Sequence, residues 1–464
     1  MKVRAVILAG GGGSRLWPLS RSNSPKQFLE IFRHESLFQR TLKRTLQLFS
    51  AQDIFIITSF EYRFRMFNQI DFVKGLSRKQ KSLLKKNILF EPAPRSTLGA
   101  VLFVLKNLEV RCQGKEVFVV FPSDHIISPL TSFQLSVKKG IKLAREKKIV
   151  VLGVRPSGAM SDYGYILPQP QSSRESIFAI KTFVEKPSVA KARALIKEGA
   201  LWNCGIFCFR KDVFENELEK VNPLFFKIYQ KDKNVFNREF SSLPVQSLDY
   251  GLMEKTSLGW GVRLEGEWSD LGTWESFFSF FSRHQRGKYK TQILSFLNAH
   301  NCEVWADKLV VAAGVKDLLV VDSTDALLLL KKGESSYVKE IVRYLGEKKY
   351  PEVNNNIKVW RPWGYYMLLQ RGEGYKVKEI FLYPHKCLSL QRHKYRSEHW
   401  NIVEGTAKII LGRKTIILRK NRSIFVKRGQ KHKLCNPSSC RLRIIEVQIG
   451  NYLEEDDIER FDSY

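Results

Sequence analysis

The sequence lacks long apolar runs, and this absence argues against a membrane protein. No hydrophobic stretch approaches the roughly 20 residues that a membrane-spanning helix requires. Near the N-terminus the apolar run Val6–Ala9 stops in glycine. It is shorter than the apolar region of about 7–15 residues found in a secretory signal peptide. We therefore expect a cytoplasmic protein without a membrane span.

Cysteine is also scarce, with seven in 464 residues. The seven are scattered, and no two of them form a CxxC pair; they stand at positions 112, 204, 208, 302, 387, 435 and 440. Such spacing indicates neither a disulfide framework nor a zinc finger. We expect reduced thiols, most of them buried.

Acidic residues are outnumbered, because 77 Lys and Arg face 46 Asp and Glu and leave a net charge of +31. The excess is spread along the chain rather than gathered in a tail or a stripe. A dispersed positive charge attracts anionic ligands and supports weak nonspecific binding of nucleic acid. No recognised nucleic-acid-binding motif accompanies it. Small phosphate-bearing substrates therefore fit the charge at least as well, and we expect no specific nucleic-acid partner.

The length exceeds one ordinary core and indicates two or three domains. The first half alternates apolar strands with amphipathic helices, which predicts an α/β fold with a largely parallel sheet. Serine is available as a cap for the first two helices. The expected strands are Val3–Ala9, Ile54–Thr58, Asn87–Glu91, Val117–Pro122 and Ile149–Val154. The expected helices are Ser36–Leu48, Ser96–Leu108 and Phe133–Lys147.

The pattern changes near residue 285. Residues 286–350 are expected to form a short β-rich connecting segment with a helix at Ser336–Leu345, and we interpret the polar, turn-rich stretch after that helix as a linker. Residues 351–464 have no helical pattern and predict an antiparallel barrel or jelly roll. Its expected strands include Tyr375–Tyr383, Leu388–His393, Trp400–Val403, Thr415–Leu418 and Leu442–Val447. The expected domains are thus 1–285, 286–350 and 351–464. Assembly into a homo-oligomer stays open.

A glycine-rich loop follows the first strand and reads GGGGSRLWPLSRSNSPKQF. Glycines let backbone N–H groups approach phosphate oxygens closely. The loop is not a Walker loop, because no GK[ST] follows. It is not a dinucleotide fingerprint either, because Arg15 and Leu16 stand where the last glycine is required. Two cations, Arg15 and Lys26, suit a nucleoside triphosphate whose pyrophosphate must leave.

This loop resembles that of nucleotidyltransferases that make sugar nucleotides, specifically mannose-1-phosphate guanylyltransferases, whose motif is LAGGxGxRLWPLSRxxxPKQF. Further matching motifs follow in family order: EPAPRST, FPSDH, YGYI, FVEKP, WNCGIF, LDYGLMEK and WSDLGTW. The resemblance implies a Rossmann-like domain with a mixed sheet. It also implies transfer of GMP from GTP to mannose 1-phosphate, giving GDP-mannose and pyrophosphate for polysaccharide biosynthesis.

The resemblance also implies roles for individual residues. Two carboxylates far apart in sequence, Asp124 and Asp270, would hold Mg²⁺, a hard cation that prefers oxygen ligands. The catalytic set would be Arg15, Lys26, Asp124 and Asp270. Nucleotide binding would fall to Gly10, Gly11, Gly13, Arg15, Lys26, Arg95 and Ser96, and sugar-phosphate binding to Gly164, Glu185, Lys186 and Asn203. Ser96 replaces an asparagine of the family motif in a segment expected near the purine.

Four of the eight histidines stand at positions 385, 393, 399 and 432. Gln391 and His393 alternate on an expected strand and would share one face. Together with Glu398 and His432 they stand at the ligand positions of the cupin pattern. Imidazole, carboxylate and amide groups around one ion suit Zn²⁺ or a similar divalent metal.

The same stretch resembles the phosphomannose isomerase domain fused to many such guanylyltransferases, through RPWGYY, LSLQ, EHW and EVQIGNYLEEDDIERF. The resemblance implies an all-β cupin, or jelly roll, that interconverts mannose 6-phosphate and fructose 6-phosphate. His393-Lys394-Tyr395 stands where the family usually has three histidines.

The favoured hypothesis is a bifunctional enzyme, and three alternatives remain. The chain could be a guanylyltransferase with a structural cupin, or a non-catalytic regulator that binds nucleotide sugars. The third alternative, a nucleic-acid-binding module, has only the charge in its favour. The retained phosphate and metal groups, Arg15, Lys26, Asp124 and Asp270, argue against the regulator, since a non-catalytic homologue need not keep them.

Overall fold

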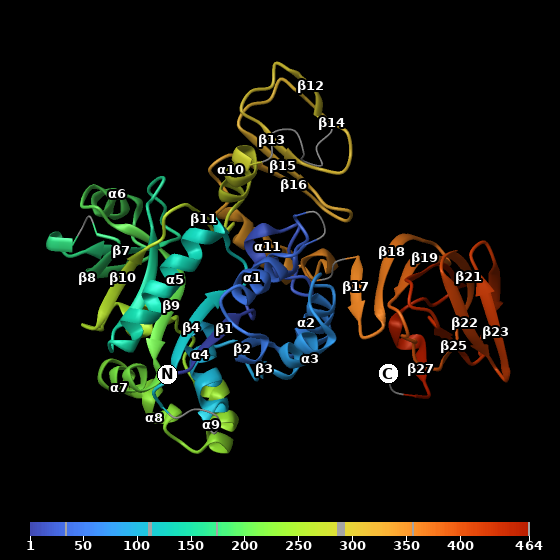
Figure 1. Ribbon diagram of the computed structural model, residues 1–464. Coiled ribbons are helices and arrows are strands. Elements are labelled where there is room, and N and C mark those ends of the chain that lie inside the picture. Colours follow the sequence, from blue (N-terminus) through green and yellow to red (C-terminus); the bar gives the residue numbers. More distant parts are fainter. Residues whose placement is uncertain (33–34, 110–113, 173–174, 285–292, 355–356, 463–464) are drawn as a thin grey trace. The chain divides into compact units, whose positions relative to one another are not determined.

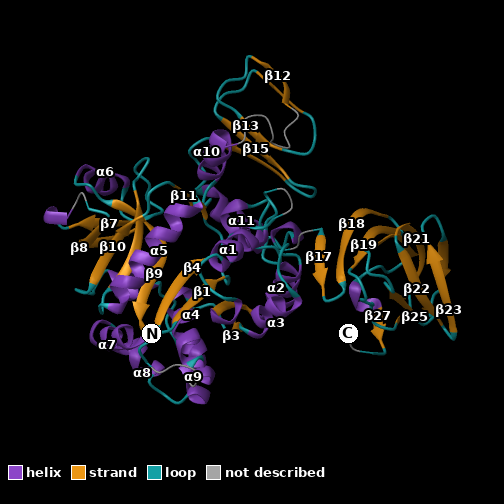
Figure 2. Cartoon of the chain, viewed as in Figure 1, coloured by secondary structure: helices purple, strands orange, loops and turns teal. Residues whose placement is uncertain are grey.

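The computed structural model describes residues 1–32, 35–109, 114–172, 175–284, 293–354 and 357–462 (Figures 1 and 2). The chain divides into two compact units. The first comprises Met1–Ser323 and Leu327–Tyr350, and the second comprises Thr324–Ala326 and Pro351–Tyr464. The boundary expected at residue 285 lies outside the described residues. Within the described part of the chain, no helix is both long and apolar enough to cross a membrane.

A nine-stranded mixed sheet, in the order β3-β2-β1-β4-β9-β6-β10-β8-β7, organises the first unit. Strands β3, β2, β1 and β4 are mutually parallel, and β9 runs antiparallel to both β4 and β6. The mixed sheet is as predicted, and each expected strand lies within one residue of its observed bounds. The strands are β1 (Val3–Leu8), β2 (Ile54–Ser59), β3 (Ile88–Glu91), β4 (Val117–Pro122), β6 (Ile149–Val154), β7 (Gly164–Pro168), β8 (Ile177–Glu185), β9 (Leu201–Arg210) and β10 (Gly259–Arg263). A separate pair joins β5 (Ile126–Ser128) to β11 (Glu267–Ser269).

Helices cover both faces of this sheet (Figure 2). Alternation along β1 explains why: Ala5 and Ile7 pack on one face in a core with Phe38 of α1, whereas Val6 packs on the other in a core with Leu98 of α4. The helices are α1 (Leu37–Leu46), α2 (Arg63–Asp71), α3 (Arg78–Lys86), α4 (Ser96–Asn107), α5 (Leu130–Arg145), α6 (Val189–Lys197), α7 (Lys211–Val221), α8 (Pro223–Tyr229), α9 (Lys233–Glu239) and α10 (Trp274–His284).

One of the two predicted serine caps is observed. Ser36 caps α1 in a reciprocal capping box with Gln39. The prediction that Ser96 caps α4 is wrong, because Ser96 is the first residue of the helix and Arg95 precedes it without a side-chain cap. The nearby Thr97 hydroxyl instead accepts a hydrogen bond from the N–H of Leu248.

The rest of the first unit is β-rich. Strands β12 (Ile293–Leu297) and β14 (Val310–Ala313) pair in parallel. Strand β13 (Glu303–Trp305) pairs in parallel with β15 (Leu318–Asp322). Strand β15 in turn pairs antiparallel with β16 (Leu327–Lys331). Helix α11 (Tyr337–Glu347) follows, close to the predicted position.

Two antiparallel sheets form the second unit, and this arrangement confirms the predicted jelly roll. Their strand orders are β17-β18-β19-β26-β21-β24 and β23-β22-β25-β20-β27. Burial alternates strictly along β19, as expected when one face of a sheet covers a core. The strands are β17 (Lys358–Arg361), β18 (Gly364–Gly372), β19 (Tyr375–Leu382), β20 (Gln391–His393), β21 (Arg396–Glu404), β22 (Thr406–Leu411), β23 (Lys414–Arg419), β24 (Ser423–Val426), β25 (His432–Cys435), β26 (Leu442–Gly450) and β27 (Ile458–Arg460).

The second unit also holds a disulfide, between Cys387 and Cys435. The prediction of reduced thiols is therefore wrong for these two residues. They are 48 residues apart in sequence, but the barrel pairs them in an isolated antiparallel bridge, which no local spacing reveals. Cys204 and Cys208 are buried free thiols, as predicted. Cys112 lies outside the described residues.

Candidate functional site

The first cluster surrounds the ammonium group of Lys26. The glycine loop leaves β1 and passes directly over this residue, where a Cβ at Gly13 would clash with the Lys26 side chain. Gly13 also adopts a left-handed φ of 56°. The Nζ of Lys26 lies 2.7 Å from Oδ2 of Asp124 and also donates to the backbone carbonyl of Asp270. One buried cation thus ties together the two segments predicted to carry the metal ligands.

Asp124 follows β4 at the carboxyl edge of the parallel strands, where ligand sites of such sheets lie. Burial alone would raise the pKa of Asp124, but the charges of Lys26 and His125 outweigh it and lower this pKa. The Asp124 carboxylate is therefore ionised at neutral pH. The imidazole Nδ1 of His125 lies 3.1 Å from the carbonyl oxygen of Cys204.

Asp270 is held in a fixed orientation by its neighbours. Its Oδ1 accepts hydrogen bonds from the Tyr163 hydroxyl at 2.7 Å and from the N–H of Gly272 at 2.9 Å. The indole of Trp274 donates to the carbonyl of Trp17, so the loop carrying Asp270 is tied to the end of the glycine loop. Among the described residues, these hydrogen bonds go to Oδ1 of Asp270 and none goes to Oδ2.

A cavity opens above this cluster at the carboxyl edge of the sheet. Its lining includes Gly10, Gly11, Gly13, Asp124 and Asp249. The backbone of the glycine loop and the carboxylates of Asp124 and Asp249 thus face the same space, an arrangement suited to a metal-bound polyphosphate.

Two predicted nucleotide ligands stand apart from the Lys26 cluster. Arg15 pairs with Asp162, with 3.3 Å between Nη1 and Oδ1, and the side chains of both residues are 41% exposed. The guanidinium of Arg95 donates to the backbone carbonyl of Ser241. Ser96 lines a second cavity beside the glycine loop. The structure therefore gathers Gly10, Gly11, Gly13, Lys26, Asp124 and Asp270 but not the two arginines.

The predicted sugar ligands lie together. A Cβ at Gly164 would clash with the carboxylate of Glu185 and would lie 3.2 Å from the Cβ of Asn203. Lys186 pairs with Glu185, with 2.7 Å between Nζ and Oε1. The amide of Asn203 donates to Oδ1 of Asp249 at 2.7 Å. Burial and the charge of Glu185 raise the pKa of Asp249 to about 6.

Sequence reasoning missed three members of this site: His125, Tyr163 and Asp249. Each lies inside a matching motif, but the residue type alone carries no signal of its role. Tyr163 contacts a carboxylate 107 residues away, and Asp249 contacts an amide 46 residues away. Only the fold brings these partners together.

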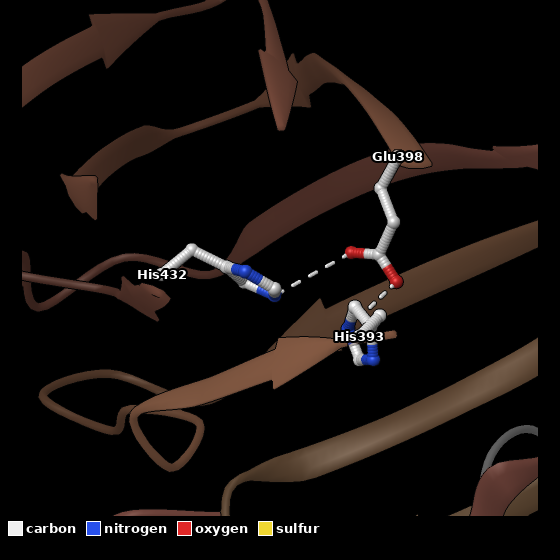
Figure 3. A group of neighbouring side chains, drawn as sticks. All are labelled: His393, Glu398 and His432. Carbon is white, nitrogen blue, oxygen red and sulfur yellow. Dashed lines mark ion pairs between the residues drawn. The ribbon is translucent and has the colours of Figure 1, made fainter. Parts of the chain in front are cut away.

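The second cluster lies inside the jelly roll. His393 on β20, Glu398 on β21 and His432 on β25 place ligand atoms within 4.8 Å of one another, and all three residues are buried (Figure 3). Nε2 of His393 lies 3.0 Å from Oε1 of Glu398, and Nε2 of His432 lies 3.7 Å from Oε2. Three predicted ligands therefore converge, and the fourth, Gln391, places its Nε2 3.4 Å from Nε2 of His432.

The surroundings of this cluster fit a divalent metal. Nδ1 of His432 lies 2.9 Å from the Gln430 carbonyl oxygen, which orients Nε2 toward the cluster. Nδ1 of His393 is buried and has no hydrogen-bond partner among the described residues. Burial alone would raise the pKa of Glu398, but His393, His432 and Arg396 hold it well below its usual range. A buried carboxylate that stays ionised between two imidazoles is a suitable metal-binding set.

A cavity extends from this cluster and carries further charged groups. Arg361, Lys378, Arg460 and Glu446 are among its lining residues. Burial and the charge of Glu398 raise the pKa of Glu446 to about 8. Lys394 and Tyr395, where the chain departs from the family pattern, do not line this cavity. Their backbone N–H groups donate to Asp457 instead.

A glycine-rich loop beside paired carboxylates on a mixed α/β sheet, joined in one chain to a jelly roll with a His-Glu-His cluster, defines a nucleotidyltransferase with a cupin-like C-terminal domain. The chain belongs to the nucleotidyl transferase family, whose model matches residues 4–286. Residues 296–345 match the family described as MannoseP isomerase/GMP-like beta-helix domain, and residues 347–463 match Mannose-6-phosphate isomerase C-terminal.

Similar proteins span nearly the whole chain. The alginate biosynthesis protein AlgA of Pseudomonas aeruginosa is 35% identical over 98% of this chain and 96% of its own length. Mannose-1-phosphate guanylyltransferase 2 of Escherichia coli O157:H7 is 35% identical over 98% of this chain and 97% of its own. A crystal structure described as mannose-1-phosphate geranyltransferase from Thermus thermophilus covers 75% of this chain and 100% of its own, with 28% identity and a TM-score of 0.63.

Proposed function

We propose that the chain transfers GMP from GTP to mannose 1-phosphate, producing GDP-mannose and pyrophosphate. The observation that carries the proposal is the buried Lys26 ammonium between Asp124 and Asp270, directly beneath the glycine loop. Relatives of matching length, among them one named mannose-1-phosphate guanylyltransferase, support the choice of substrates.

In this reaction a phosphate oxygen of mannose 1-phosphate attacks the α-phosphorus of GTP. The bond between the α-phosphorus and its bridging oxygen breaks, and pyrophosphate leaves with the electron pair. The backbone of Gly10, Gly11 and Gly13 would hold the phosphates, while Lys26 and Arg15 neutralise charge on the departing group. Arg15 must exchange its surface contact with Asp162 for the triphosphate.

The carboxylates of Asp124 and Asp270 would hold Mg²⁺, because both residues border Lys26 and, among the described residues, the hydrogen bonds to the Asp270 carboxylate go to its Oδ1. When bound, the ion supplies positive charge to the phosphates of the nucleotide. Gly164, Glu185 and Asn203 would receive the sugar, with Asp249 orienting the Asn203 amide. Lys186 would bind the phosphate of mannose 1-phosphate.

A second activity, interconversion of mannose 6-phosphate and fructose 6-phosphate, is favoured by the His393-Glu398-His432 cluster. These residues and Gln391 would hold Zn²⁺ or another divalent metal, which when bound stabilises negative charge on the substrate oxygens. The cations Arg361, Lys378 and Arg460 in the same cavity suit the substrate phosphate. The proton would move between the second and first carbon atoms of the sugar. A structural cupin is the competing hypothesis.

The transferase proposal is tested with a matrix of nucleoside triphosphates and sugar 1-phosphates, in which released pyrophosphate is measured with Mg²⁺ present. GTP with mannose 1-phosphate should give the highest kcat/KM. A chain that releases no pyrophosphate with any pair, yet binds GDP-mannose, would instead be a regulator.

We also propose that the transferase, connecting and cupin segments are 1–285, 286–350 and 351–464. The division of the chain into compact units at Tyr350 supports the last boundary.

A further inference from the structure

The disulfide of the jelly roll lies beside the proposed metal ligands. Cys435 is the last residue of β25, and His432 is the first residue of the same strand. Cys387 precedes β20, which carries Gln391 and His393. The covalent bond therefore joins the two chain segments that supply three of the four proposed ligands.

Few other contacts hold these two segments in register. Strand β20 is three residues long and pairs with β25 at one position, Gln391 with His432. Among the described residues, the only further pairing between the segments is the isolated bridge at the two cysteines, with one backbone hydrogen bond on either side. The other neighbour of β20 is β27, at the edge of the sheet. Strand β25 is anchored independently, because it pairs with β22 at four positions.

A small dithiol can reduce this bond by thiol–disulfide exchange, since Cys387 is only half-buried. The first thiolate of the reductant attacks one sulfur atom, breaks the S–S bond and forms a mixed disulfide. Its second thiol then displaces the protein sulfur. The reductant supplies two electrons and two protons and leaves as a cyclic disulfide, while Cys387 and Cys435 become thiols.

We propose that this disulfide positions the cupin ligands, so that metal affinity depends on the redox state of the two cysteines. With the bond formed, Gln391 and His393 are held against His432, and the metal meets a preorganised set of ligands. After reduction, β20 loses its covalent tie to the anchored strand β25. Ordering its ligands then costs part of the binding free energy. The inference rests on the proposed metal site and adds its regulation.

The test is a titration of the full-length protein with Mn²⁺ before and after reduction with dithiothreitol, which is removed by anaerobic desalting. Mn²⁺ is the probe because thiolates select softer metals, and excess Mg²⁺ occupies the carboxylates of the first unit. Electron paramagnetic resonance measures free Mn²⁺, and His432→Ala identifies the binding that belongs to the cupin. Reduction should weaken this binding by roughly 10- to 100-fold, the range observed when a group that orients metal ligands is lost.

Thermodynamic linkage supplies a second measurement on the unmodified sequence. If the disulfide tightens Mn²⁺ binding, Mn²⁺ must stabilise the disulfide by the same factor. In a fixed mixture of reduced and oxidised dithiothreitol, saturating Mn²⁺ should therefore raise the ratio of oxidised to reduced protein by roughly 10- to 100-fold. Alkylation followed by mass spectrometry measures this ratio. At saturating Mn²⁺ the reduced protein should also recover the kcat of the oxidised protein for isomerisation, which a collapsed cupin would not.

The Cys387→Ser, Cys435→Ser double variant should bind Mn²⁺ as weakly as the reduced wild type, with or without reductant. Cys440→Ser is the matched control, because Cys440 is an exposed free thiol of the same unit. It should bind Mn²⁺ like the wild type in both redox states. If the double variant fails to fold, the linkage measurement on the wild type decides the inference.

The outcomes separate the inference from the function on which it rests. Unchanged or tighter Mn²⁺ binding after reduction overturns the inference and leaves the proposed metal site standing. Absence of His432-dependent Mn²⁺ binding in the oxidised protein overturns both the inference and the proposed metal site. Guanylyl transfer is judged separately, by the release of pyrophosphate.

Discussion

Lys26 shows how one residue organises the transferase site. It is a buried cation, at 5% exposure, with an ionised carboxylate 2.7 Å away. Removing such a partner leaves a buried charge uncompensated, which destabilises a protein more than loss of a surface pair does. A defect in a Lys26 variant would therefore mix structural and catalytic losses. Arg15 offers a cleaner test because its side chain is 41% exposed.

Arg15→Ala should lower kcat for GDP-mannose formation by roughly 10²-fold, comparable with the loss of a preorganised charge donor. Its stability should change by no more than about 0.5 kcal/mol, as is usual for surface positions. Steady-state kinetics at saturating GTP provide the measurement. Asp162→Asn is the control, because it removes the surface partner of Arg15 but keeps the cation. Near-normal turnover of Arg15→Ala would refute the role of this arginine.

The disulfide between Cys387 and Cys435 predicts the number of reactive thiols. After reduction, the unfolded chain should alkylate at two more cysteines than it does when unfolded without reductant. Intact mass spectrometry counts the added groups. The Cys387→Ser, Cys435→Ser double variant should show no such increase on reduction. An equal count in the wild type before and after reduction would restore the original expectation of free thiols.

Among the elements, α1 links the fold to the site. Its Thr41 hydroxyl donates to the Ser123 carbonyl, next to Asp124, and its start is fixed by the Ser36 capping box. Helix α3 begins with an equivalent capping box at Ser77, which is exposed. The two helices thus offer the same local motif in a buried and an exposed setting.

Ser36→Ala should lower the free energy of unfolding by about 1–2 kcal/mol, and Ser77→Ala by about 0.5–1 kcal/mol. The difference arises because the buried Ser36 hydroxyl also donates to Gln69, which would lose its partner. Urea denaturation of both variants measures the difference between their losses of unfolding free energy. Equal losses, or a larger loss for Ser77→Ala, would show that burial of the cap adds nothing.

The sequence predicts an element best when the element's own apolar residues account for its burial. Strand β4 lies at its expected bounds because its apolar run is buried on both faces. The alternating Gln391 and His393 likewise predict a shared face. The order of strands and the antiparallel β9 depend on contacts between distant segments, which periodicity does not encode. For the same reason, only the structure revealed the roles of Tyr163 and Asp249 and the disulfide of Cys387.

On the scale of the whole molecule, the chain carries two chemically distinct centres. Asp124 and Asp270 belong to the first compact unit, whereas His393, Glu398 and His432 belong to the second. The first set offers oxygen ligands suited to Mg²⁺, and the second adds imidazole, which suits Zn²⁺ and similar metals. The proposed reactions are not consecutive, since mannose 6-phosphate must first become mannose 1-phosphate. A separate phosphomannomutase activity is therefore needed between them.

The most direct test of this account measures both reactions in the wild type, Asp270→Asn and His432→Ala. Asp270→Asn should lose guanylyl transfer by roughly 10²-fold or more while isomerisation is retained. His432→Ala should lose isomerisation and bound divalent metal while GDP-mannose synthesis stays near normal. Chelation and metal add-back on the wild type should abolish and restore isomerisation. If no divalent metal supports isomerisation in the wild type, or if His432→Ala impairs both reactions equally, the account of two independent centres is contradicted.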